Sequence, residues 1–139
     1  MSPDPTQSAA VHVSTIRDPR FTAVAELDGT TMSLHMEGTA DANVESHLAS
    51  FFGQVQERNS AGGVSETIVD LRKLAFMSSS CFKHVLTWVM TVSAAPFDSA
   101  RPRIHFLSDV GRGWQRRGLR SLISVAGDVV TIEEREETS

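Results

Sequence analysis

Two stretches near the start of the chain alternate between apolar and polar residues, as a strand with one buried face does. They run from Phe21 to Leu27 and from Met32 to Glu37, and Asp28-Gly29 between them is a turn signal. The pattern therefore predicts a β-hairpin. Gly38 follows directly and is expected to end the second strand, because glycine weakens strands.

Three later segments repeat apolar residues every three or four positions, which predicts helices. The apolar stripes are Val44, Leu48, Phe51, Phe52 and Val55, then Phe82, Val85, Leu86, Val89 and Val92, and last Trp114, Leu119, Leu122, Ile123 and Ala126. Asp41 or Asn43 can cap the first helix, Ser79 lies near the start of the second, and the third begins at about Gly113.

Short apolar runs follow each of these helices, at Thr67–Leu71, Arg103–Leu107 and Val129–Glu133. The first is apolar enough to predict a strand buried on both faces. A hairpin followed by alternating helices and strands predicts a single α/β domain with a mixed central sheet covered by helices.

The ends of the chain do not follow these patterns. Residues 1–10 contain two prolines and few apolar side chains, so they are expected to form a disordered leader. Residues 134–139 are mostly charged or small and predict a flexible acidic tail. The folded domain is therefore expected to span residues 11–133, and Pro96 is expected to close the second helical region.

Composition supports one ordinary domain and excludes several classes of function. The chain has 139 residues, of which 40% are hydrophobic and 22% charged. A net charge of -4 argues against nucleic acid as a partner. No apolar run reaches membrane-spanning length and no signal peptide is present, so neither a membrane nor export is expected. The lone Cys81 cannot form an internal disulfide, which favours a reducing, cytoplasmic location.

Three consecutive serines, Ser78, Ser79 and Ser80, stand where the strand gives way to the second helix. One hypothesis is helix capping, which is worth about 1 kcal/mol and accounts for one serine, or two. The other is phosphorylation, because free amides and the helix dipole favour negative charge at a helix N-terminus.

The order of elements and the segment "IVDLRKLAFMSSSCF" resemble the STAS domain, the family of sulfate transporters and anti-sigma-factor antagonists. Asp70-Leu71 matches the strand end of that family, and Phe76-Met77 matches its apolar pair. The family continues with Asp-Ser-Ser/Thr-Gly, against which this chain has Ser78, Ser79, Ser80 and Cys81. The later segment from Arg101 to Glu133 resembles a bacterial STAS-like branch with a Trp-Gln-basic motif.

The resemblance implies a regulatory protein-binding module that is not an enzyme and needs no cofactor. Its partner would be an anti-sigma-type serine kinase, with a phosphatase as counterpart. Ser79 aligns with the phosphorylated position and is the first candidate, followed by Ser78 and Ser80. The residues expected to contact the partner are Ser78, Ser79, Ser80, Cys81, Phe82 and Lys83. Because Ser78 and Cys81 depart from the family, the alternative is a constitutive scaffold or homodimer without phosphorylation.

Other residue combinations give weaker hypotheses. Cys81 and His84 are spaced like a thiol and its base, but Cys81 continues the apolar stripe and no carboxylate is expected beside His84. The histidines lack metal-ligand spacing, and they are His12, His35, His47, His84 and His105. Trp114 is expected either to pack in the core or to anchor an interface. Positive charge gathers around the start of the third helix, at Arg112, Arg116, Arg117 and Arg120. These arginines are either the solvated face of an amphipathic helix or a basic surface that meets an acidic partner or a phosphate.

Overall fold

A computed structural model describes residues 10–94 and 102–135. The elements are β1 (Ala10–Asp18), β2 (Phe21–Asp28), β3 (Thr31–Ala40), the short 3-10 helix η1 (Ala42–Val44), α1 (Glu45–Ser60), β4 (Glu66–Met77), α2 (Ser79–Ser93), β5 (Arg103–Asp109), α3 (Gly113–Ala126) and β6 (Val130–Arg135). Nearly all of the predicted leader, Pro96 and residues 136–139 of the predicted tail lie outside the described residues.

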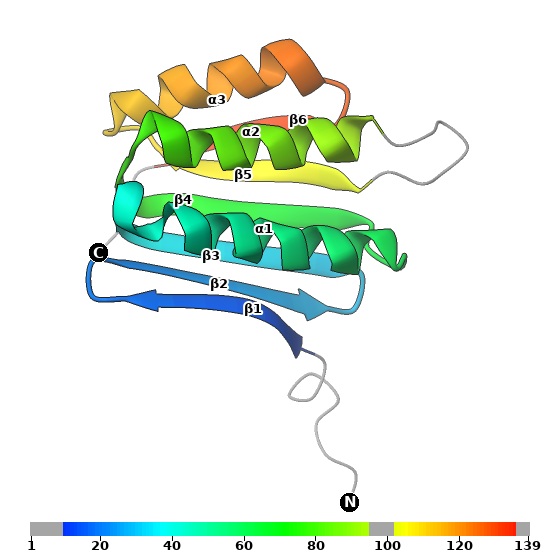
Figure 1. Ribbon diagram of the computed structural model, residues 1–139. Helices are drawn as coiled ribbons and strands as arrows, with labels where there is room; N and C mark the ends of the chain where they lie inside the picture. Colours follow the sequence, from blue (N-terminus) through cyan, green and yellow to red (C-terminus); the bar gives the residue numbers. More distant parts are fainter. Residues whose placement is uncertain (1–9, 95–101, 136–139) are drawn as a thin grey trace, which may run out of the picture.

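The predicted α/β fold with a mixed sheet is confirmed (Figure 1). The six strands lie side by side in chain order, from β1 to β6. The pairs β1–β2 and β2–β3 are antiparallel, and the pairs β3–β4, β4–β5 and β5–β6 are parallel. The hairpin at Asp28-Gly29 is confirmed, and Gly29 has the positive φ of 65° that such a turn requires.

The first strand, β1, was not predicted, because only Ser14 and Ile16 of its residues are buried. A strand with so few apolar positions gives no clear alternation. The predicted hairpin is therefore a three-stranded antiparallel unit with β1 at its edge. Ala10, expected in the leader, belongs to β1, and β6 runs on to Arg135, into the segment expected to be a tail.

All three helices cover the same face of the sheet (Figure 1). Residues on that face are buried, and four of them, Ala25, Leu34, Val69 and Phe106, are no more than 1% exposed. The neighbouring residues along each strand point to the opposite face, which the helices leave open. The prediction that Thr67–Leu71 is buried on both faces is therefore wrong, since Ile68 and Asp70 are only half-buried there.

Gly38 does not end the second strand of the hairpin, contrary to the prediction. It lies within β3 at a φ of 99°, directly opposite Phe21 of β2. A Cβ atom on Gly38 would stand 2.1 Å from the backbone oxygen of Arg20. That oxygen accepts a hydrogen bond of 2.7 Å from the amide of Thr39. The glycine thus allows the turn between β1 and β2 to pack directly on the end of β3.

Candidate functional site

The strand β4 is longer than predicted and extends beyond its pairing with β5. It pairs with β3 along its length, but with β5 only from Glu66 to Asp70. Its register against β3 shifts twice beyond Asp70, so β4 contains extra residues there. After the second shift, at Ala75, the side chain of Phe76 is 49% exposed. The bulges thus turn an aromatic ring outward just before the three serines.

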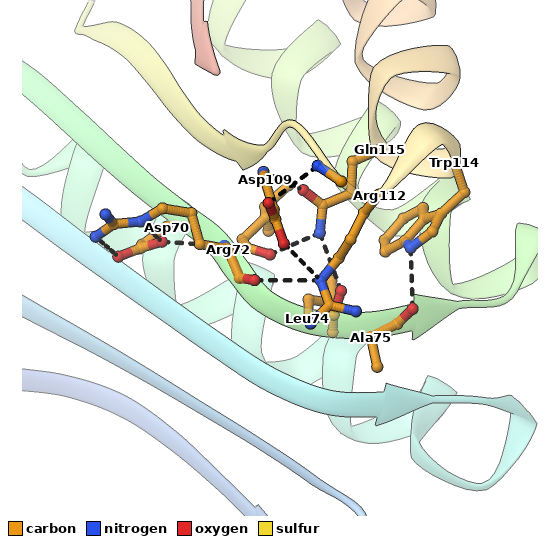
Figure 2. A network of polar contacts seen from close by, with 10 residues as sticks. Asp70, Arg72, Leu74, Ala75, Asp109, Arg112, Trp114 and Gln115 are labelled. Atoms are coloured by element: carbon orange, nitrogen blue, oxygen red, sulfur yellow. Dashed lines mark hydrogen bonds and ion pairs between the residues drawn. The ribbon is translucent and has the colours of Figure 1, made fainter. Parts of the chain in front are cut away.

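Gln115 holds the part of β4 that has no β5 partner (Figure 2). Its side chain is buried, with 1% exposed, on the inner face of α3. The amide nitrogen Nε2 donates to the backbone oxygens of Leu71 at 2.7 Å and Leu74 at 2.9 Å. The amide oxygen Oε1 accepts from the backbone nitrogen of Asp109 at 2.9 Å. One side chain thereby satisfies three backbone groups that a neighbouring strand would otherwise pair.

Two further side chains from the start of α3 complete this contact (Figure 2). Arg112 Nε donates to the backbone oxygen of Arg72 at 3.3 Å and lies 3.4 Å from Asp109 Oδ2. Trp114 Nε1 donates to the backbone oxygen of Ala75 at 2.9 Å. Trp114 is half-buried and packs against the core, so it matches the packing alternative more closely than the interface alternative. We call Arg112, Trp114 and Gln115 the α3 clamp.

The clamp was not predicted from the sequence, although a polar residue on the apolar stripe of the third helix pointed to it. Gln115 lies on the same helical stripe as Leu119, Leu122 and Ala126, where a polar residue is unexpected. A buried amide at such a position needs partners. Gln115 could therefore have been predicted to be a buried hydrogen-bonding residue, unlike the exposed arginines that follow it.

The three serines have different environments. Ser78 is the N-cap of α2, with extended backbone angles, and its Oγ accepts from the backbone nitrogen of Cys81 at 3.2 Å. The hydroxyls of Ser78 and Ser80 are hydrogen-bonded to each other at 3.2 Å. Ser79 is exposed, and its hydroxyl has no hydrogen-bond partner among the described residues. Ser78 is thus occupied by the cap, and Ser80 by its hydrogen bond to Ser78, whereas Ser79 is accessible.

We expect Ser78→Ala to lower the free energy of unfolding by about 1 kcal/mol, because the backbone amide of Cys81 loses its acceptor. Ser79→Ala should change it by only a few tenths of a kcal/mol, since no hydrogen bond is lost. Urea denaturation of both variants checks the difference. Equal effects would contradict the capping assignment.

Cys81 is fully buried and cannot contact a partner, so its predicted place in the docking surface is wrong. The thiol donates to the backbone oxygen of Asp41 at 3.2 Å. Burial raises the pKa of the thiol, and the charges of Glu45 and Asp41 raise it further, against a smaller opposing effect of the Ser78 hydrogen bond. Since only a thiolate is a strong nucleophile, these surroundings do not favour thiol chemistry.

A carboxylate does lie beside His84, contrary to expectation. Glu45 Oε2 is 3.3 Å from His84 Nε2 and joins the start of α1 to α2. This contact was not foreseen because the two residues are far apart in the sequence and meet only when the helices pack. With the Cys81 thiol directed to a backbone oxygen, the pair has no adjacent nucleophile to activate.

Of the other two residues of the predicted docking surface, Phe82 packs between helices and Lys83 is exposed. Phe82 is half-buried, and a Cβ on Gly118 of α3 would stand 3.3 Å from its ring. Gly118 therefore lets α2 and α3 approach closely. Lys83 is exposed. The accessible side chains around the start of α2 are thus Phe76, Ser79 and Lys83, which we call the α2 surface.

The end of β3 is joined to the start of α2. Asp41 caps η1 by accepting from the amide of Asn43 at 3.0 Å, and its other oxygen is 3.0 Å from Arg20 Nη1. The prediction that Asp41 or Asn43 caps the first long helix is therefore wrong, because η1 precedes α1 and the N-cap of α1 is Val44, which forms no side-chain hydrogen bond. The amide of Ser78 donates to the backbone oxygen of Ala40 at 2.9 Å. The position of the serines is therefore fixed from the β3 side as well as by the clamp.

The four arginines predicted to form one basic surface have separate roles. Arg112 belongs to the clamp, and Arg116 Nε pairs with Glu134 Oε2 at 2.8 Å. Arg117 and Arg120 are exposed and have no ion-pair partner among the described residues. Only part of the predicted surface is therefore available to a ligand.

An ion pair stabilises the open sheet face beside the clamp (Figure 2). Arg72 donates to both carboxylate oxygens of Asp70, at 3.0 and 2.8 Å. Burial raises the pKa of Asp70, but these hydrogen bonds outweigh it and hold the pKa below its ordinary value. Arg72 also carries the backbone oxygen that Arg112 binds, so the pair helps to fix the clamped segment.

In residues 10–94 and 102–135, no group of three or more histidine, cysteine, aspartate or glutamate side chains could hold a metal ion. None of the helices in those ranges is both long and apolar enough to cross a membrane. No protein-family model matches the chain, and no curated protein matches it significantly.

Proposed function

We propose that this chain is a regulatory protein-binding module of the STAS type, switched by phosphorylation of Ser79. The observation that carries the proposal is the Ser79 hydroxyl, which is exposed and has no hydrogen-bond partner among the described residues at the start of a 15-residue helix. Ser78 supplies the cap, so modification of Ser79 leaves the helix start intact.

The α2 surface supplies what a docking site requires. Phe76 offers an exposed aromatic ring, the kind of side chain that dominates binding energy in protein interfaces. A phosphate on Ser79 adds about 1.5 to 2 negative charges three residues along the chain from Phe76. The helix dipole and the free amides tolerate this charge in the isolated domain. In a complex the phosphate would have to lose its water, and docking would weaken.

The resemblance to STAS domains suggests the partners. The docking partner would be an anti-sigma-type serine kinase or a related signalling protein, and a phosphatase would restore the unmodified form. The proposal includes a cytoplasmic location, where such kinases act. It assigns the chain no catalytic activity and no cofactor.

We expect Ser79→Asp to bind the partner at least about tenfold more weakly than Ser79→Ala, because only the aspartate places a charge in the interface. The partner is captured from a native extract with the wild-type chain, and its affinity is measured by biolayer interferometry. Thr87→Asp, which adds the same charge to an exposed position further along α2, is the matched control. Equal affinities of Ser79→Asp and Ser79→Ala would contradict the switch.

The alternative function is a constitutive scaffold or homodimer. It is favoured by Ser78, which caps α2 by itself at the position where the STAS family has an acidic residue. Met90 of α2, 49% exposed, would contribute to the dimer interface. Chains isolated from native cells would then be unphosphorylated, and their mass by light scattering would rise with concentration.

A further inference from the structure

A groove of about 370 Å³ is lined by residues of α3, β5 and β6. The strand β6 is the edge strand at the end of the sheet away from β1 (Figure 1). The apolar lining of the groove comes from Leu119 and Ile123 of α3 and from Ile132 of β6. Ile123 is 41% exposed, so the apolar lining is accessible to a ligand. The groove is separate from the α2 surface and is not used by the proposed switch.

No strand of the described part of the chain pairs with the outer edge of β6 along this groove. Within the described residues β6 pairs only with β5. The backbone oxygens of Val129 and Arg135 accept hydrogen bonds from the β5 side, from the amides of Ile104 and Val110. Because backbone groups alternate in direction along a strand, those of Ile132 and Glu134 point to the outer edge. A peptide strand could therefore add to β6 there.

The groove also contains a buried polar group without a partner. Ser108 lines it from β5, is 1% exposed, and its hydroxyl forms no hydrogen bond with any described residue. A buried hydroxyl left in this state destabilises the folded protein. A polar group entering the groove that reached this hydroxyl would remove this destabilising effect.

The charge at the rim of the groove selects the ligand. Arg116 and Arg120 line it from consecutive turns of α3, together with Glu134. Glu134 pairs with Arg116, whereas Arg120 has no ion-pair partner among the described residues. One guanidinium therefore remains available in a protein whose net charge is -4. Guanidinium groups bind carboxylates with two parallel hydrogen bonds.

From the outer edge of β6, the apolar lining and the available arginine, we infer that the groove binds an extended acidic peptide. The peptide adds to β6 as a further strand through the backbone groups of Ile132 and Glu134. One apolar side chain enters between Ile123 and Ile132, and a carboxylate two positions along the peptide, on the same face of the added strand, pairs with Arg120. A small anion would use only the arginine, whereas a peptide uses the whole groove.

The probe is a peptide of about six residues in which valine and glutamate take turns at every second position, with threonine between them, so that both side chains lie on one face of the strand. It is titrated while the amide signals of β6 are followed by NMR. We expect shifts at Ile132 and Glu134. Arg120→Glu should weaken binding at least about tenfold, and Arg117→Glu, the same change on α3 outside the groove, should not. Ile132→Pro should abolish binding without unfolding the protein, because an edge strand tolerates proline where the amide faces outward.

Four results would overturn the inference. The first is the absence of shifts in β6 at millimolar peptide. The second is equal binding of a peptide in which lysine replaces glutamate. The third is that acetate alone produces the same shifts, which would indicate a simple anion site. The fourth is a concentration-dependent mass of the peptide-free protein that Ile132→Pro removes, since β6 of a second copy would then occupy the edge.

Discussion

Replacing Gln115 with leucine is expected to lower the free energy of unfolding by about 3–5 kcal/mol. The leucine side chain fills similar space but leaves three backbone groups without partners, on Leu71, Leu74 and Asp109. Each such buried group costs about 1–3 kcal/mol, and the added apolar contact offsets part of the total. Urea denaturation monitored by circular dichroism measures the change.

Two further measurements distinguish loss of the clamp from a general effect of mutation. Arg117→Leu, at an exposed position of the same helix, should change the free energy of unfolding by less than about 0.5 kcal/mol. Hydrogen exchange in Gln115→Leu should speed up at residues 71–77 before it does so in the β2–β3 hairpin. A loss below about 1 kcal/mol would show that the clamp does not hold β4.

Gly38→Ala is expected to destabilise the protein by about 3 kcal/mol or more. The new methyl group would stand 2.1 Å from the backbone oxygen of Arg20, far inside van der Waals contact. A φ of 99° also strains any side chain, by about 1–3 kcal/mol. Relief requires the turn between β1 and β2 to move away from β3, which would disturb the ion pair between Arg20 and Asp41.

Gly53→Ala is the matched control for this substitution. Gly53 is exposed inside α1, and a Cβ there meets no atom within 4 Å. Alanine should therefore stabilise the protein by about 0.5–1 kcal/mol, since glycine is the weaker helix former. Thermal unfolding of both variants should move the midpoint in opposite directions. A neutral Gly38→Ala would refute the role assigned to this glycine.

The sequence predicted those parts of the fold in which burial follows a regular period. The three helices and the β2–β3 hairpin each have one apolar face, and their bounds were close to those observed. In contrast, β1 buries little, and the bulges at Arg72 and Ala75 interrupt the alternation of β4. Neither feature leaves a periodic signal, so both were missed.

The position of the candidate site was predicted from the sequence, but the separate roles of its residues were not. The three serines at the start of α2 were correctly placed, and Ser79 was preferred only because it aligns with the STAS family. Their difference in accessibility depends on the geometry of the cap and on the hydrogen bond between Ser78 and Ser80. The α3 clamp was hidden because its contacts join residues about forty positions apart, such as Gln115 and Leu74.

The most direct test of the proposed switch is phosphosite mass spectrometry on the chain isolated from native cells, separated into partner-bound and free fractions. We expect a phosphate on Ser79 in the free fraction and none in the partner-bound fraction. A Ser79 without phosphate in both fractions, or with the same phosphate occupancy in both, would contradict the proposed switch.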